Sequence, residues 1–248
     1  MILPTDPVFY IVAIAAIALV GLAKGGFSGL GATTMPLLAL VMDPVAAAAM
    51  LLPILLVQDV VSVWAFRKSY DRTTLLWMLP GGCFGVFLGW WLAASVNSDV
   101  IRALVGLIAV GFGSYRLSGF RLSSDKPLPQ WLASFWGGVS GFTSQVAHSG
   151  GPPFQVWALT RNFPHTVFVG TSSIFFAAIN WVKVPAYLAL GQFTRDNMQL
   201  TLLFMPVAIA TTFAGVWLVR KIPADRFYGI INWLMVAVGL ALLWKSLS

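Results

Sequence analysis

The chain has 248 residues, of which 58% are hydrophobic and only 9% are charged. Because a soluble domain uses roughly 25% charged residues, this composition excludes an ordinary water-soluble protein and indicates an integral membrane protein. The formal net charge is +7, but the 15 Lys and Arg residues lie mostly at the ends of apolar runs, where they act as topology signals. We therefore expect no nucleic-acid partner.

The cysteine and histidine content limits the chemistry further. Cys83 is the only cysteine, which excludes an internal disulfide and a cysteine-based metal cluster. Two histidines do not complete such a cluster, and we expect neither a metal nor a cofactor. The first apolar run lacks a basic leading segment and a small-residue cleavage site, so it is predicted to stay in the mature protein.

Apolar runs of about 20 residues predict an all-α polytopic membrane protein rather than a barrel, whose strands would alternate over about 10 residues. Two segments are too short to cross a hydrocarbon core of about 30 Å. Each is expected either to form a re-entrant hairpin with the segment before it or to dip and rejoin across a thinned site. The predicted helices are 8–24, 32–41, 45–66, 73–95, 99–117, 131–147, 152–160, 166–189, 197–218 and 226–245, of which 32–41 and 152–160 are the short ones.

The two halves of the chain repeat one order of motifs. GGFSG at 25–29 corresponds to GGVSG at 137–141, and a fixed offset of 126 carries Gly89 onto Gly215. One membrane domain is therefore predicted, composed of a first repeat at 1–120, a hydrophilic cytoplasmic linker at 121–130 and a second repeat at 131–248.

Basic loops indicate how the halves face each other. The loops 67–72 and 219–226 and the linker are basic, and the positive-inside rule places all three in the cytoplasm. Loop 67–72 has the sequence RKSYDR, whereas its counterpart, GQFTRDN at 191–197, has one Arg and one Asp. Because corresponding loops of the two halves differ in their content of basic residues, the repeats are predicted to be inverted. Inversion requires an odd number of membrane crossings in each half. It places both termini on the non-cytoplasmic side of the inner (cytoplasmic) membrane.

Glycine-rich breaks precede the two short segments, at 24–34 and 137–153. Non-helical backbone inside a bilayer is tolerated only where it is buried in protein or lines a wet cavity. Inverted repeats with interrupted helices are typical of secondary transporters, which bind substrate where the breaks meet. Because each helix start exposes N–H groups and partial positive charge, two such starts favour an anion. The candidate binding residues are Lys24, Gly25, Gly26, Gly29, Gly31, Thr33, Thr34, Ser144, Gln145, His148, Ser149, Gly150 and Gly151.

Ionisable residues at membrane depth need a partner or a purpose, since each costs a few kcal/mol there. Lys24 is interpreted as the counter-charge to an anionic substrate, with snorkelling to an interface and pairing with Asp59 as alternatives. Asp59 and Lys183 are expected to neutralise one another across the pseudo-two-fold axis; alternatively, Asp59 carries a coupling proton. His148 is expected either to bind an oxyanion or relay a proton, or to be a satisfied structural histidine.

The chain resembles the TauE/SafE sulfite exporter family of membrane permeases. The resemblance lies in the stretch AKGGFSGLGATTMPLLAL at 23–40, in a weaker repeat of this stretch in the second half and in the duplicated layout. The resemblance runs over nearly the whole chain. It implies export of sulfite, a related sulfur oxyanion or an organosulfonate, and it makes Lys24, the glycines after it and Pro36 the family-like first break. The second break departs from the motif by having Trp136 near the lysine position and by an insertion with Gln145 and His148. The identity of the transported anion is therefore left open.

Two other functions would use the same residues. A passive anion channel would need the same site with a different gate. GFSG at 26–29 and GVSG at 138–141 resemble the nucleophile motif of rhomboid intramembrane proteases, in which His148 would activate Ser28 or Ser140. Because the motif occurs twice and small residues at this spacing pack membrane helices, we predict a transporter that works by alternating access rather than an enzyme. Its partners are expected to be a small inorganic or sulfonate anion and membrane lipid, with homodimerisation left open.

Overall fold

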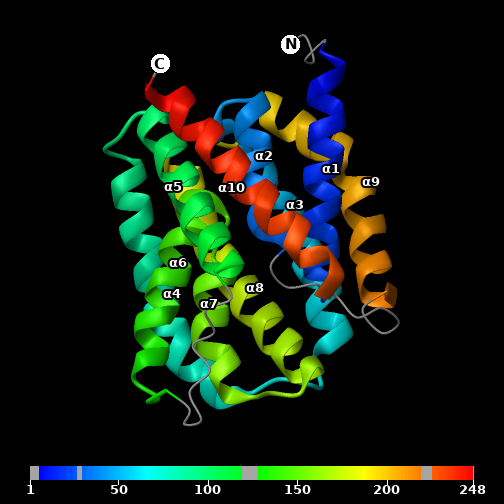
Figure 1. The fold of residues 1–248 in the computed structure, drawn as a ribbon, viewed down its shortest axis with the longest axis vertical. Helices are drawn as coiled ribbons and strands as arrows, with labels where there is room; N and C mark the ends of the chain where they lie inside the picture. The colour runs from blue at the N-terminus through cyan, green and yellow to red at the C-terminus, as the bar shows by residue number, and fades with distance from the viewer. Residues whose placement is uncertain (1–5, 27–29, 119–127, 219–224, 248) are drawn as a thin grey trace.

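The computed structural model describes residues 6–26, 30–118, 128–218 and 225–247, with side chains for all of these except 225–231. Every regular element in this part of the chain is helical, and six of the helices are long and apolar enough to cross a membrane. The all-α polytopic prediction is therefore confirmed. The elements are α1 (Pro7–Lys24), η1 (Leu30–Thr33), α2 (Thr34–Val41), α3 (Pro44–Phe66), α4 (Arg72–Ala93), α5 (Ser98–Leu117), α6 (Leu132–Ala147), α7 (Gly151–Ala158), η2 (Leu159–Arg161), α8 (His165–Ala189), α9 (Arg195–Leu218) and α10 (Asp225–Leu247) (Figure 1).

Local sequence sets where the long helices of the first half begin. A short polar side chain stands before each of them and accepts a hydrogen bond from a backbone N–H of the first turn, which would otherwise lack a partner. Proline at the first position of α1 and of α3 has no N–H to satisfy and holds the backbone in a helical conformation. The capping residues are Asp6 for α1, Asp43 for α3, Asp71 for α4 and Asn97 for α5.

Contacts between neighbouring helices define the course of the first half. Gly21 and Gly25 of α1 lie against Thr211 and Gly215 of α9, so these two helices run in the same direction. Hydrogen bonds from α9 to Met50 and from Gln58 to α9 show that α3 runs in that direction too. Because α1 and α3 are parallel, the chain between them must return, and η1 with α2 makes that return (Figure 1).

The second half follows the same plan with exchanged packing partners. α6 packs along α4, just as α1 packs along α9, and α7 returns the chain to the start of α8. α3 and α8 are antiparallel, since Gly170 lies beside Ser69 while Asn180 lies beside Asp59. α5 and α10 also run antiparallel in direct contact. Corresponding helices of the two halves therefore run in opposite directions where they meet.

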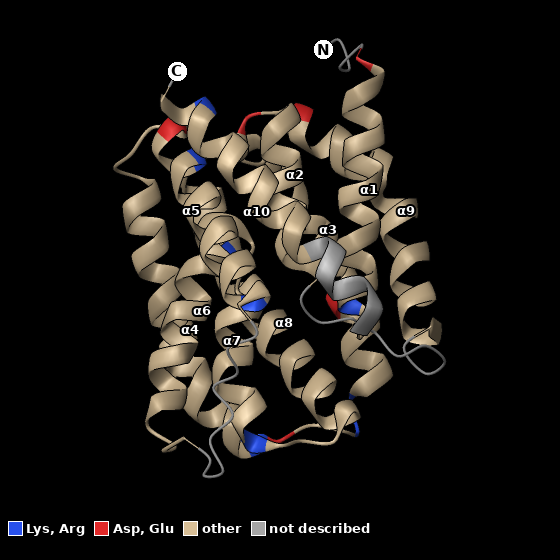
Figure 2. Ribbon diagram, viewed as in Figure 1, with Lys and Arg blue, Asp and Glu red and all other residues tan. Residues whose placement is uncertain are grey.

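The outer surface of this bundle is apolar, as a lipid environment requires. Large side chains such as Trp64, Trp91 and Trp181 are exposed along the helices. Charged residues gather mainly near the two ends of the bundle, with few in between (Figure 2). Both termini lie at one end and the connection between α3 and α4 lies at the other (Figure 1). The few charges in the middle mark the candidate functional region.

Candidate anion site

A cavity of about 100 Å³ lies between the two glycine-rich breaks, α3 and α8. This space holds several water molecules or one small anion. The breaks touch each other here, because Ser149 Oγ donates a hydrogen bond to the Ala32 carbonyl oxygen at 3.2 Å. Of the residues predicted from the sequence, those that line the cavity are Lys24, Gly26, Gly31, Ser144, His148 and Gly151.

Lys24 is the cation that faces the cavity. It is the last residue of α1, and Gly26, two residues further on, has φ 129°, a conformation that favours glycine and turns the chain out of the helix. Lys24 Nζ forms an ion pair with Asp59 Oδ1 of α3, and its carbonyl oxygen accepts a hydrogen bond from Ser62 at 2.8 Å. The Lys24 side chain is 13% exposed and that of Asp59 is 2% exposed. Asp59 therefore lies behind Lys24, away from the cavity.

Asn180 lies between the carboxylate and the second lysine. Its Nδ2 donates to Asp59 Oδ2 at 2.7 Å, and its Oδ1 accepts from Lys183 Nζ at 2.9 Å. The expected neutralisation of Asp59 by Lys183 is therefore not what the structure shows: the ion pair forms with Lys24. The physical reason is that Asn180, one turn before Lys183 on α8, occupies the position between the two charges.

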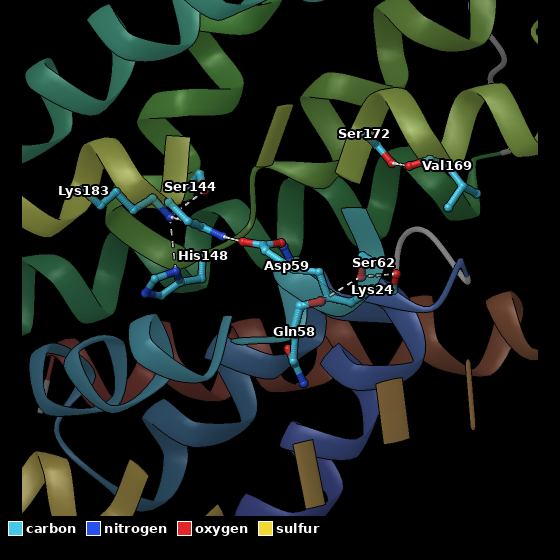
Figure 3. A network of polar contacts seen from close by, with 10 residues as sticks. Lys24, Gln58, Asp59, Ser62, Ser144, His148, Val169, Ser172 and Lys183 are labelled. Carbon is cyan, nitrogen blue, oxygen red and sulfur yellow. Dashed lines mark hydrogen bonds and ion pairs between the residues drawn. The ribbon is translucent and has the colours of Figure 1, made fainter. Parts of the chain in front are cut away.

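Lys183 is fully buried and has a hydrogen-bond acceptor for each of its three N–H groups. The acceptors are Asn180 Oδ1, Ser144 Oγ at 2.8 Å and His148 Nδ1 at 3.3 Å (Figure 3). This set suits an ammonium. Lys183 does not line the cavity, and the charge of Lys24, which does, is balanced by Asp59.

His148 has a strained backbone at the end of α6. Its φ of 47° and ψ of 24° lie in the left-handed region, which is uncommon for a residue other than glycine and often occurs at functional sites. The turn is closed by hydrogen bonds from the His148 N–H to Ser144 and from the Ser149 N–H to Thr143. This turn directs the chain from α6 into the second break.

The predicted nucleophile motif has a structural role in the second half. The break predicted at 137–153 is shorter in the structure, because residues up to Ala147 are helical in α6 and α7 begins at Gly151; the second break is therefore 148–150. Ser140 Oγ donates to the Gly150 carbonyl oxygen at 2.7 Å, which ties α6 to this break. The His148 nitrogens contact Lys183 Nζ, the Ala48 carbonyl oxygen and the Tyr187 hydroxyl. His148 is thus engaged by groups other than Ser140. Ser28 of the first motif lies outside the described residues.

The remaining predicted ligands hold the breaks together rather than line the cavity. The hydroxyl groups of Thr33 and Thr34 donate to the carbonyl oxygens of Leu30 and Ala16, so they are not free to bind an anion as expected. Ser149 is used by the contact with Ala32.

Three further predicted ligands contact other helices or groups. Gly25 packs against Gly215, Gln145 packs against Gly89, and Gly150 accepts from Ser140. Gly29 lies outside the described residues.

The two helix starts also differ from the prediction. The first short helical segment begins as a 3-10 turn at Leu30, and Gly31 of this turn lines the cavity. The second begins at Gly151 and continues with Pro152 and Pro153, which have no N–H. The second start therefore offers fewer backbone donors than a helix start without prolines.

Gln155 of α7 is a cavity residue that the sequence reasoning missed. Its Oε1 accepts from Arg116 of α5 at 3.3 Å, and its buried Nε2 has no hydrogen-bond partner among the described residues. Because a guanidinium only donates, the contact fixes Oε1 on the Arg116 side and leaves the amide N–H₂ as a donor beside the cavity. The one signal in the sequence is an amide in the otherwise apolar helix GPPFQVWA.

The described residues include no group of three or more ionisable side chains that could hold a metal ion. The fold and this site thus define a multi-pass membrane protein with a small cavity, lined by Lys24, between two interrupted helices. A family model described as sulfite exporter TauE/SafE matches residues 13–242, and the chain belongs to this family of membrane transporters. Neither the curated proteins nor the solved structures gave a match.

Proposed function

We propose that this protein is a secondary transporter that exports sulfite, a related sulfur oxyanion or an organosulfonate, with the anion bound in the cavity beside Lys24. The observation that carries the proposal is the Lys24 ammonium in the lining of a cavity that a small anion fits. Charge-assisted hydrogen bonds to an oxyanion are the strongest that a site of this kind makes. Gln155 adds a neutral donor that suits an oxygen atom of the same anion.

The proposed transport cycle is alternating access between two inverted repeats. Its support is the exchange of packing partners, in which the first helix of each half, α1 or α6, packs on the fourth helix of the other half, α9 or α4. The antiparallel course of α3 and α8 through the site supports it too. In such a cycle one half rocks against the other around a fixed site.

The proposed orientation places both termini outside the inner membrane and the basic connection between α3 and α4 in the cytoplasm. The positive-inside rule and the positions of these segments at opposite ends of the bundle support this orientation.

The test is anion flux into liposomes that contain the purified protein. Sulfite is compared with sulfate, thiosulfate and a small sulfonate, for wild type, Lys24→Ala and Lys68→Ala. Lys68 is exposed in the connection between α3 and α4, so its replacement is a matched loss of one lysine outside the site. We expect saturable, anion-selective flux that Lys24→Ala loses and Lys68→Ala keeps. No flux of any anion by folded wild type contradicts the proposal, and flux that does not saturate indicates a channel.

A further inference from the structure

The cation that faces the cavity is already neutralised. Lys24 Nζ is paired with Asp59 Oδ1, and the second oxygen of the same carboxylate accepts from Asn180 at 2.7 Å. An anion that enters the cavity meets Lys24, because Asp59 is only 2% exposed behind it. The anion therefore has to compete with a carboxylate that is tethered beside the same ammonium.

Binding of the anion to Lys24 would leave Asp59 in an unfavourable state. A buried carboxylate that loses its cation keeps a desolvation penalty of several kcal/mol. Asp59 would also lie close to the bound anion, with only the Lys24 ammonium between the two negative charges. Like charges this close favour protonation of one of them. A proton on Asp59 removes both penalties at once.

Lys183 is not placed to become the new partner of Asp59. Its three N–H groups are used by Asn180, Ser144 and His148, and moving it to the carboxylate would break these contacts in a fully buried environment. Asn180 also separates the two groups. Protonation of Asp59 leaves the three contacts of Lys183 unchanged and alters only the contacts of Asp59 itself.

Within the part of the chain that the structure describes, no other group beside Asp59 is placed to take up the proton in its stead. Lys24 on α1, Lys183 on α8 and His148 beside Lys183 are the ionisable side chains that face it from two sides. From α9, the described contacts with this face of α3 are made by Thr201 and Ala208, which do not titrate.

The other two helices that pack on α3 are α2 and α5, and they add no ionisable partner for Asp59. α2 has no ionisable residue. On α5, Asp99 and Arg102 form an ion pair with each other, and Arg116 contacts Gln155.

We propose that Asp59 takes up one proton when an anion occupies Lys24 and gives it back when the anion leaves, so that Asp59 couples anion transport to proton movement. This inference rests on the proposed function. In the empty protein Asp59 is ionised and paired with Lys24. In the loaded protein it is a neutral acid, Lys24 holds the anion, and anion and proton cross the membrane together.

The test counts protons and anions in the same liposomes, with a pH-sensitive dye inside and labelled anion outside. Wild type is compared with Asp59→Asn, which mimics the protonated acid permanently, and with Asp99→Asn, which removes a carboxylate that is 61% exposed on α5. We expect wild type and Asp99→Asn to move one more proton per anion than Asp59→Asn. The difference between variants cancels any proton that the anion itself carries.

A binding measurement covers the case in which Asp59→Asn does not transport. Affinity of the purified wild-type protein for thiosulfate, which stays fully ionised near neutral pH, should rise as the pH falls, by up to about tenfold for each pH unit. Equal proton counts in wild type and Asp59→Asn, or a wild-type affinity independent of pH, would overturn the inference while anion flux still supports the proposed function. Absence of flux for every anion would instead overturn the proposed function.

Discussion

Lys183 Nζ lies 3.3 Å from His148 Nδ1, and this contact defines the state of the imidazole. An ammonium only donates hydrogen bonds, so Nδ1 must accept. The opposite nitrogen, Nε2, lies 3.1 Å from the Ala48 carbonyl oxygen, which only accepts, so Nε2 carries the hydrogen. His148 is therefore a neutral imidazole that holds Lys183 in place.

The left-handed backbone of His148 gives a first prediction. His148→Asn and His148→Ala both lose the imidazole contacts, but asparagine adopts the left-handed region more readily than alanine. We expect His148→Ala to be less stable than His148→Asn by about 1 kcal/mol in detergent denaturation experiments. Equal stability of the two variants would show that this backbone conformation is not imposed by the fold.

The glycines of the GVSG stretch give a second prediction, about packing. A Cβ atom would lie 2.3 Å from the Met78 carbonyl oxygen at Gly137 and 2.0 Å from the Gly82 carbonyl oxygen at Gly141. Gly137→Ala and Gly141→Ala should therefore separate α6 from α4 and strongly lower the thermal stability. At Gly138 the nearest atom would be 3.5 Å away, which is an ordinary contact. Gly138→Ala is thus the matched control, and a loss of stability as large as in the other two would refute this packing explanation.

Gln155 gives a third prediction, about anion affinity. Gln155→Leu removes the amide donor beside the cavity, and we expect roughly 10- to 150-fold weaker anion binding, since a hydrogen bond to a charged group contributes about 1.5–3 kcal/mol. Gln155→Glu should weaken binding more, because it adds a negative charge where the anion binds. Isothermal titration with the purified protein checks this order. Tighter binding by Gln155→Glu would show that the anion lies elsewhere.

The proposed orientation gives a fourth prediction, about topology. In a Cys83→Ala background, Ser69→Cys lies in the connection between α3 and α4, and Ser98→Cys lies at the start of α5. A membrane-impermeant thiol reagent applied to intact cells should label Ser98→Cys and spare Ser69→Cys until the membrane is opened. Labelling of both positions in intact cells would contradict the inverted arrangement, because these positions would then share one side.

Much of the fold was predictable because its causes are local in the chain. Apolar runs, capping residues such as Asp43 and Asn97, and first-turn prolines act within a few residues, and all ten predicted segments correspond to helices. The main difference is at the first short segment, which begins with a 3-10 turn at Leu30 instead of at residue 32. Gly31 inside this turn interrupts the apolar pattern from which the start of the segment was predicted.

The sequence by itself determined the membrane class, the family and the breaks next to Lys24 and His148, since these depend on composition and on motifs along the chain. Only the tertiary structure decided that Asp59 pairs with Lys24, that Asn180 separates it from Lys183, and that Gln155 reaches the cavity. The lysine and the carboxylate are 35 residues apart, and the carboxylate and the asparagine are 121 apart. A buried charge is satisfied by whichever groups the packing of helices brings within hydrogen-bond distance, and residue order does not encode that distance.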